Sequence, residues 1–171
     1  GSGTANSSTF LRGDNTFAAA GGVNTPAFSV GIGSGNQSIS SATLTLINFD
    51  SENYDIGGGY NTSSKRFTVP SGEAGKYHFT AKIGIDSNVT TDATSQQLTI
   101  ELYHFNSGDV EQKYARGRTS LTQVVNPTVS VSTDFALAVG DYVVAKVLIS
   151  AAKTLLATGA YTSWSGFKII E

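Results

Sequence analysis

The sequence contains no cysteine and no methionine, and only three of its 171 residues are proline. Without cysteine the chain can form neither disulfide bonds nor thiolate metal sites. Only 14% of the residues are charged, and 11 basic against 13 acidic residues leave a net charge of −2. Because nucleic-acid-binding domains carry a basic excess, we expect no nucleic-acid partner. No apolar run approaches the length of a transmembrane helix, so we also expect no membrane insertion.

The missing methionine leads us to expect that the chain is an excised C-terminal piece of a longer protein. Residues 1–3, Gly-Ser-Gly, resemble an expression scar and carry no weight for the fold. Residues 4–25 are small and polar apart from two apolar islands, and this composition predicts a stalk or linker segment. Residues 26–171 have the length and hydrophobic content of one domain.

Hydrophobic residues make up 39% of the chain, and many of them alternate with polar ones. In the clearest case, between Lys76 and Ile85, the odd-numbered residues from Tyr77 onward are apolar and most even-numbered ones are polar. Such alternation places one side-chain set in a core and leaves the other in water or at an interface. Further strands are predicted over 28–32, 44–49, 67–69, 98–103, 129–139 and 142–149. Only residues 150–157 show a helical period. Many short strands separated by Gly, Asn and Pro turns predict an all-β sandwich or barrel.

Four segments stand out along the domain: Ala27-Phe28-Ser29-Val30-Gly31, the run from Tyr60 to Ile85, Ala138-Val139-Gly140-Asp141-Tyr142-Val143, and the closing stretch from Tyr161 to Ile170. In this order they resemble the globular heads of complement C1q and tumour necrosis factor. The central run includes Phe67-Thr68-Val69-Pro70 and Gly75-Lys76-Tyr77-His78-Phe79. The chain departs from the family after Leu102 and over 151–158. This resemblance implies an all-β jelly-roll sandwich that assembles as a homotrimer.

A second resemblance covers Thr9 to Phe17, which contains Leu11-Arg12-Gly13-Asp14. It is similar to segments of tailed-phage fibre proteins that precede a C-terminal adhesive domain, with Asn15 in place of a glycine and Phe17 in place of a tryptophan. Arg12-Gly13-Asp14 is also formally the integrin-binding tripeptide. We interpret it as part of the fibre-like segment.

The stretch from Tyr114 to Pro127 contains arginines but no carboxylate, and we predict a loop there. The family resemblance implies that this loop lies toward the apex of a trimer, where threefold symmetry would gather six arginines. Guanidinium groups suit carboxylates and phosphates. The candidate ligand-binding residues are Arg116, Arg118, Gln123 and Asn126. The alternative is that both arginines are solubilising surface charges.

Aromatic residues near the C-terminus form a second candidate set. The resemblance implies that the closing strand lies beside the threefold axis, which makes Tyr161, Trp164 and Phe167 candidates for the trimer interface. The alternative is that they belong to the core of one chain. If Trp164 is exposed, it could also serve as a sugar-stacking platform.

The sequence gives little indication of catalytic or metal-binding motifs. The two histidines, His78 and His104, stand in no metal-binding spacing. Asp50, Glu52 and Asp55 could supply oxygen ligands for calcium, but their spacing matches no known loop and a solvated acidic turn is the simpler interpretation. We therefore predict no catalytic residues and no cofactor, and an axial or loop Ca²⁺ has no support in the sequence.

Together these patterns favour a non-catalytic receptor-binding domain of a tailed-phage fibre, spike or head-decoration protein. It would lie on the virion surface or outside the cell. Its expected partners are itself, as a homotrimer, and a host cell-surface polysaccharide or protein receptor. The alternatives are a purely structural trimerisation or capping domain, a secreted C1q-like lectin or ligand, and a fibre-borne depolymerase. The depolymerase would need a carboxylate pair across a groove, which no spacing in the sequence suggests.

Overall fold

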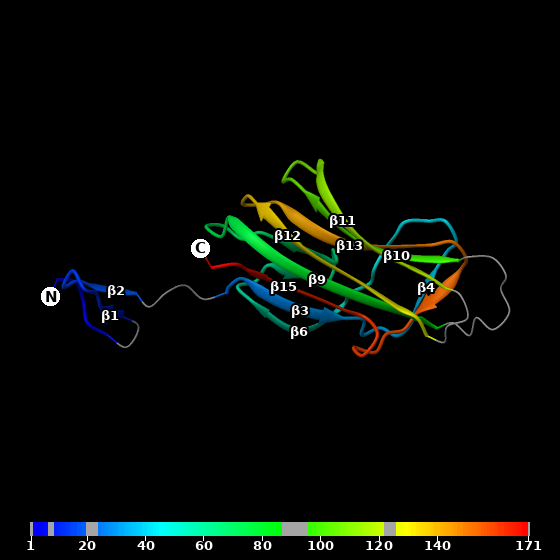
Figure 1. Ribbon diagram of the computed structural model, residues 1–171, viewed down its shortest axis with the longest axis horizontal. Coiled ribbons are helices and arrows are strands. Elements are labelled where there is room, and N and C mark those ends of the chain that lie inside the picture. Colours follow the sequence, from blue (N-terminus) through cyan, green and yellow to red (C-terminus); the bar gives the residue numbers. More distant parts are fainter. Residues whose placement is uncertain (1, 7–8, 20–23, 87–95, 122–125, 171) are drawn as a thin grey trace.

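The computed structural model describes residues 2–6, 9–19, 24–86, 96–121 and 126–170 (Figure 1). Its strands are β1 (Thr9–Leu11), β2 (Phe17–Ala19), β3 (Ala27–Gly31), β4 (Gln37–Ile39), β5 (Thr45–Leu46), β6 (Ser51–Ile56), β7 (Tyr60–Asn61), β8 (Arg66–Thr68), β9 (Gly75–Asp86), β10 (Gln97–Phe105), β11 (Glu111–Ser120), β12 (Thr128–Leu137), β13 (Tyr142–Ile149), β14 (Lys153–Leu155) and β15 (Ser163–Lys168). These ranges hold no helix that could span a bilayer.

Two antiparallel sheets form the body of the protein. Sheet I has the order β4-β14-β9-β15-β3-β6, and β12 also pairs with β9. Sheet II has the order β11-β10-β13-β8-β7, with β5 paired to β13. Both sheets join strands that are distant in sequence, as in the pairing of β15 with β3 and β9. The predicted all-β architecture is confirmed, and Figure 1 shows β9, β15 and β3 side by side in one layer.

The core lies between the two sheets and follows the predicted alternation. The odd-numbered residues of β9 from Tyr77 to Ile85 are all buried, whereas the even-numbered side chains before Gly84 point outward. At its centre Trp164 makes edge-on contacts with Phe28 and Tyr60, at ring-centroid distances of 5.0 and 5.5 Å. Each large apolar side chain buried in this way stabilises the fold by about 1.5–3 kcal/mol.

Several predicted boundaries were wrong. Residues 114–120, predicted as a loop, belong to β11, because their backbone pairs in register with β10. Residues 150–157, which show a helical period, instead contain β14, which pairs with both β4 and β9. Between 44 and 49 only β5 is a strand. Val139 follows the end of β12 and is exposed. For 114–120 and 150–157, long-range strand pairing outweighed the local pattern.

The N-terminal segment contains a hairpin that the sequence did not reveal. Strands β1 and β2 pair with each other in a separate two-stranded sheet. In the turn between them, the Asp14 carboxylate accepts hydrogen bonds from the hydroxyl and the backbone N–H of Thr16, and these bonds lower the pKa of Asp14. The Arg12-Gly13-Asp14 tripeptide thus forms part of a hairpin turn, and the expectation that 4–25 serves as a stalk stays a prediction.

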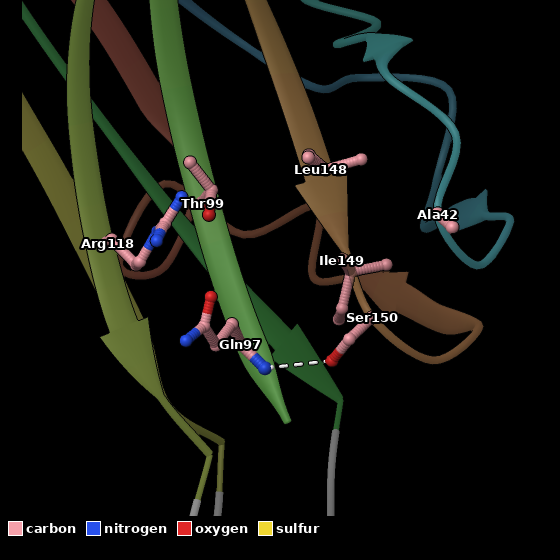
Figure 2. Close-up of a pocket in the computed structure, with 7 residues that line it drawn as sticks. All are labelled: Ala42, Gln97, Thr99, Arg118, Leu148, Ile149 and Ser150. Atoms are coloured by element: carbon pink, nitrogen blue, oxygen red, sulfur yellow. Dashed lines mark hydrogen bonds between the residues drawn. The ribbon is translucent and has the colours of Figure 1, made fainter. Parts of the chain in front are cut away.

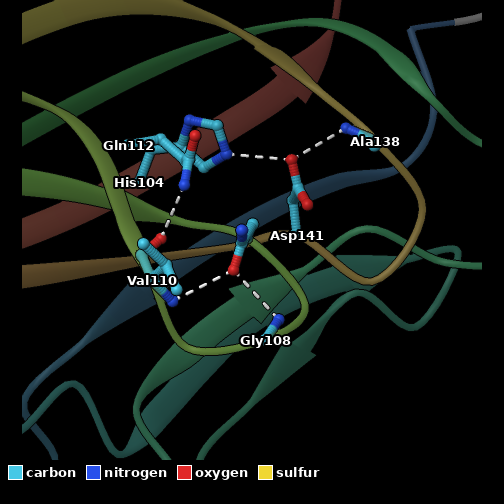
Figure 3. Close-up of polar contacts among 7 residues, drawn as sticks. His104, Gly108, Val110, Gln112, Ala138 and Asp141 are labelled. Carbon is cyan, nitrogen blue, oxygen red and sulfur yellow. Dashed lines mark hydrogen bonds and ion pairs between the residues drawn. The ribbon is translucent and has the colours of Figure 1, made fainter.

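The turn before β13 is held by a buried ion pair. Asp141 Oδ2 lies 2.9 Å from His104 Nε2 and also accepts a 3.0 Å hydrogen bond from the Ala138 backbone N–H (Figure 3). Nearby, the Asn106 side-chain oxygen accepts hydrogen bonds from the Gly108 and Val110 backbone N–H groups. The Gly-Asp turn that resembles the family motif therefore ties the end of β10 to the start of β13.

Close approach of the two sheets at one edge depends on Gly117. A Cβ atom added to this residue of β11 would lie 2.0 Å from the Ser130 carbonyl oxygen of β12. Since β11 belongs to sheet II and β12 to sheet I, glycine allows the two edges to meet. The residues on either side of Gly117 are Arg116 and Arg118, so this contact also sets the position of both arginines.

Candidate functional site

A pocket of about 250 Å³ lies on the outward face of sheet II, near one end of β10, β11 and β13. It is lined by Ala42, Gln97, Thr99, Arg118, Leu148, Ile149 and Ser150. In Figure 2 the Arg118 side chain extends from β11 toward Thr99 of β10. At the lower end of the pocket the Gln97 backbone N–H donates a 2.8 Å hydrogen bond to Ser150 Oγ. The pocket thus combines a guanidinium group, hydroxyl and amide groups, and the apolar Leu148.

The two candidate arginines differ sharply. Arg116 Nε donates a 2.6 Å hydrogen bond to Oε1 of Glu101, a residue that is only 1% exposed. This bond and the carboxylate charge raise the pKa of Arg116. By contrast, the Arg118 side chain makes no hydrogen bond or ion pair with the described residues. Arg118 is therefore free to bind an anion, whereas Arg116 already has its carboxylate partner.

Glu101 was the residue that sequence reasoning missed. The arginine-bearing stretch contains no carboxylate of its own, but the pairing of β10 with β11 places Glu101 directly opposite Arg116. The second Glu101 oxygen accepts a hydrogen bond from the Tyr103 hydroxyl. Burial raises the pKa of Tyr103, and this hydrogen bond adds to the effect. Only the strand register could have shown these contacts.

A row of four aromatic rings continues along the outward face of sheet II. Neighbouring rings are nearly parallel, with centroids 5.1 to 6.2 Å apart, in the order Tyr114, Tyr103, Phe105 and Tyr142. We call them the aromatic row. Stacked rings at this separation stabilise each other by about 0.5–1.5 kcal/mol beyond their burial.

Three cations lie against the aromatic row, and the first is the Arg116 guanidinium, 5.2 Å from the centroid of Tyr114. Lys146 Nζ lies 4.8 Å from the centroid of Tyr103 and 5.4 Å from that of Phe105. The Arg66 guanidinium lies 4.4 Å from the centroid of Tyr142. Cation–π contacts of this kind hold the charged groups in place without neutralising them. Sheet II therefore presents ordered positive charge next to the Arg118 pocket.

The two remaining predicted ligand residues are Gln123 and Asn126. Gln123 lies outside the described residues. Asn126, just before β12, does not line the Arg118 pocket. Its φ of 48° is in the left-handed region, which asparagine tolerates better than most residues. Among the described residues, Arg118 is the one predicted ligand residue that lines the pocket, and it lies on strand β11 and not in a loop.

The three candidate interface residues occupy different environments. Trp164 is fully buried within a single chain, so it is neither an interface residue nor a sugar platform. Phe167 is 37% exposed on the outward face of sheet I, and its ring lies 5.4 Å from that of His78. Tyr161 is partly buried and packs over Gly84, whose missing side chain makes room for it. A trimer-interface role for Phe167 and Tyr161 stays a prediction.

Sheet I also carries a serine–histidine–aspartate arrangement that was not predicted. His78 Nδ1 lies 2.7 Å from Asp134 Oδ1, and His78 Nε2 lies 3.1 Å from Ser132 Oγ. The order matches a nucleophile, a base and an orienting acid. However, the Asp134 and His78 side chains are 63% and 35% exposed, so water competes for each hydrogen bond. We interpret the arrangement as a surface network that links β9 to β12.

The predicted acidic turn is wrong, because Glu52 and Asp55 belong to strand β6, which pairs with β3. The carboxylates of Asp50 and Asp55 instead have a structural role. Asp50 Oδ1 accepts a 2.6 Å hydrogen bond from the Gly33 backbone N–H. Asp55 accepts hydrogen bonds from the backbone N–H groups of Gly59 and Tyr60. Among the described residues, no group of three or more His, Cys, Asp or Glu side chains could hold a metal ion.

Comparison with solved structures identifies the architecture. The globular domain of zebrafish complement 1qA is 19% identical, with a TM-score of 0.62 over 86% of this chain and 99% of that chain. A structure of murine APRIL at pH 8.0 is 15% identical, with a TM-score of 0.61 over 84% of this chain and 98% of that one. Eiger TNF from S. frugiperda is 12% identical, with a TM-score of 0.55 over 85% and 92%. The fold is a C1q/TNF-type jelly roll.

No protein-family model and no curated protein matches the sequence. The C1q/TNF-type jelly roll is therefore recognised by its three-dimensional arrangement and by the motifs quoted above. Within it, the Arg118 pocket and the aromatic row lie on the face of a sheet and not in a loop between strands. This placement determines where a ligand could bind.

Proposed function

We propose that the chain is the non-catalytic, homotrimeric receptor-binding domain of a tailed-phage fibre, spike or head-decoration protein. In this role it binds an acidic ligand on the host cell surface through the Arg118 pocket. The observation that carries the proposal is the Arg118 guanidinium, which has no ion-pair partner among the described residues and lines a pocket that also offers hydroxyl groups and an apolar wall. Such a combination suits a carboxylate on a sugar ring.

Homotrimeric assembly is supported by the fold and by the outward face of sheet I. Ser132, Thr80, Ser165 and Ser29 lie side by side across four paired strands and give this face a row of short hydroxyl side chains. Phe167 rises beside them. Tyr54 of β6, which pairs with Ser29, is a second exposed ring at this face. A row of short side chains flanked by two exposed aromatic rings suits a subunit contact. Three tethered sites would raise avidity by roughly 10²–10⁴ over one site.

The phage context rests on the segment from Thr9 to Phe17, which resembles those that precede adhesive domains in fibre proteins. That segment forms the β1–β2 hairpin, with Arg12-Gly13-Asp14 in its turn. An attachment protein benefits from weak but repeated recognition, which a trimer supplies. Location on the virion surface belongs to the same proposal.

The ligand proposal is tested by calorimetric titration with glucuronate and, separately, with inorganic phosphate. We expect glucuronate to bind the wild-type protein and the Lys113→Gln variant alike, and to lose its binding in Arg118→Gln. Lys113 is a matched control because it is an exposed cation on the same strand as Arg118. It pairs with His104, whereas Arg118 pairs with Thr99 at the pocket. Equal binding by the two variants would contradict the proposed site, and a preference for phosphate would reassign its ligand.

Assembly is tested by light scattering. The proposal requires three times the chain mass of 17.8 kDa. A monomer would leave the jelly roll intact but would remove the case for avidity.

A purely structural role as a trimerisation or capping domain is the second candidate. The hydroxyl-lined face of sheet I favours this role, because that face can form a subunit contact without binding a ligand. This alternative predicts a stable trimer that binds none of the acidic probes.

A further inference from the structure

We propose that sheet II binds a linear acidic polysaccharide along a diagonal that runs from Arg118 through Lys146 to Arg66. This inference rests on the Arg118 anion site proposed above and extends it from one acidic group to a polymer. The diagonal crosses from the edge strand β11 over β10 and β13 to β8. We call these three residues the cationic diagonal.

The strand register sets the positions of the three cations. Arg118 pairs with Thr99, which pairs with Leu148. Lys146 is two residues along β13 from Leu148, on the same face. Two residues further, Val144 pairs with Arg66 of β8. With paired Cα atoms about 5 Å apart and a rise of about 3.4 Å per residue, the Cα atoms of Arg118 and Arg66 are about 20 Å apart. A single small anion cannot span this distance, whereas a polymer can.

None of the three cations on the diagonal forms an ion pair with a described residue. Within the described part of the chain, the ion pairs join Arg12 to Asp14, His78 to Asp134, His104 to Asp141, Arg116 to Glu101 and Lys168 to Glu73. None of them involves the cationic diagonal. Glu101, which lies beneath it, is buried and already bonded to Arg116 and Tyr103. At the far end, the Tyr142 side chain hydrogen-bonds both Asp109 and Arg66. The outer surface of sheet II thus complements a chain of negative groups.

The aromatic row indicates why the polymer should be a saccharide. Lys146 and Arg66 are held against Tyr103, Phe105 and Tyr142, so polar N–H groups alternate with ring surfaces along the diagonal. Sugar rings offer the same alternation of polar hydroxyls and apolar C–H faces. The protein's net charge of −2 would repel the dense charge of a nucleic acid. An acidic polysaccharide, which spaces its carboxylates, fits better.

The test compares trigalacturonate with hexagalacturonate by calorimetric titration of the intact protein. If the polymer follows the diagonal, the hexamer binds the wild type more tightly than the trimer does. That gain disappears in the double variant Lys146→Gln/Arg66→Gln, which keeps Arg118, and each lost cation weakens hexamer binding by about fivefold. Lys113→Gln and Lys65→Gln serve as controls off the diagonal. Arg116 is not used, because its removal would leave buried Glu101 without its cation.

The outcomes separate the two proposals. Equal affinity for both lengths, lost in Arg118→Gln, overturns the diagonal and keeps the Arg118 site. No binding of either length overturns both. A single-stranded DNA oligonucleotide that binds as tightly as the hexamer would overturn the choice of a saccharide. If circular dichroism shows that the double variant unfolds, the salt dependence of binding to the wild-type protein tests the diagonal instead. The affinity for the hexamer must then fall more steeply with salt than the affinity for the trimer does.

Discussion

The outward faces of the two sheets obey the same alternation but carry different chemistry. On sheet I a row of short hydroxyl side chains, such as Thr80, Ser132 and Ser165, crosses the neighbouring strands. On sheet II the exposed side chains include large rings and cations, such as Tyr114 and Arg116. The short side chains leave a flat surface, whereas the rings and cations pack against each other and cover themselves. A flat face suits contact with another protein surface, and a self-supporting face can hold its charged groups ready for a ligand.

The largest expected effect comes from removing the buried carboxylate of sheet II. Glu101→Ala should lower the free energy of unfolding by about 3 kcal/mol, because it leaves a void and removes the acceptor of Arg116 and Tyr103. The matched change on sheet I, Thr80→Ala, should stay within about 0.5 kcal/mol. Urea unfolding of both variants measures the difference. Similar losses would show that the two faces contribute alike and would remove the contrast.

A second effect lies where the two sheets meet. Gly117→Ala should lower the free energy of unfolding by about 2 kcal/mol, because the new methyl group would overlap the Ser130 carbonyl oxygen. It should also weaken glucuronate binding, since the strand that carries Arg118 must shift. Gly159→Ala is the control, because nothing lies within 4 Å of its added Cβ. If Gly117→Ala is as stable as this control, the sheets do not depend on that close approach.

A smaller effect is expected from the interior that both faces share. Burial, and then the nearby Glu73 carboxylate, raise the pKa of Tyr77 to about 12, against about 10 for an unburied tyrosine. The folded state therefore holds this proton more tightly than the unfolded state. The resulting stability is complete below pH 10 and is lost as the pH rises toward 12. Tyr77→Phe should flatten the stability profile in this window, as followed by urea midpoints. An unchanged profile would assign the alkaline loss to other tyrosines.

Much of the fold could be predicted from the sequence, because the alternation of apolar and polar residues and the family motifs are local signals. The core face of β9 and the Gly-Asp turn at Asp141 both follow from neighbouring residues. The predictions that failed concern features that depend on the register between paired strands. Arg116 and Arg118 look equivalent in the sequence, yet only pairing with β10 shows that one faces Glu101 and the other Thr99. The burial of Trp164 depends on Phe28 and Tyr60, which lie more than a hundred residues away. Long-range pairs of this kind leave no trace in local composition.

The smallest effect on folding should come from Phe167, and it tests the proposed role of sheet I. Because its ring is 37% exposed in the single chain, Phe167→Ser should change the free energy of unfolding of the chain by no more than about 0.5 kcal/mol. If sheet I is the subunit contact, however, light scattering should show a shift from trimer toward monomer at low micromolar concentration, since a central aromatic carries much of an interface's energy.

The matched control for that test lies on the opposite sheet. Tyr114 is 51% exposed at the end of the aromatic row, so Tyr114→Ser removes a similar exposed ring from the face assigned to the ligand. This variant should keep the trimer and weaken hexagalacturonate binding, whereas Phe167→Ser should lower avidity through assembly alone. The reverse pattern, with Tyr114→Ser dissociating the trimer and Phe167→Ser reducing monovalent binding, would exchange the roles of the two faces.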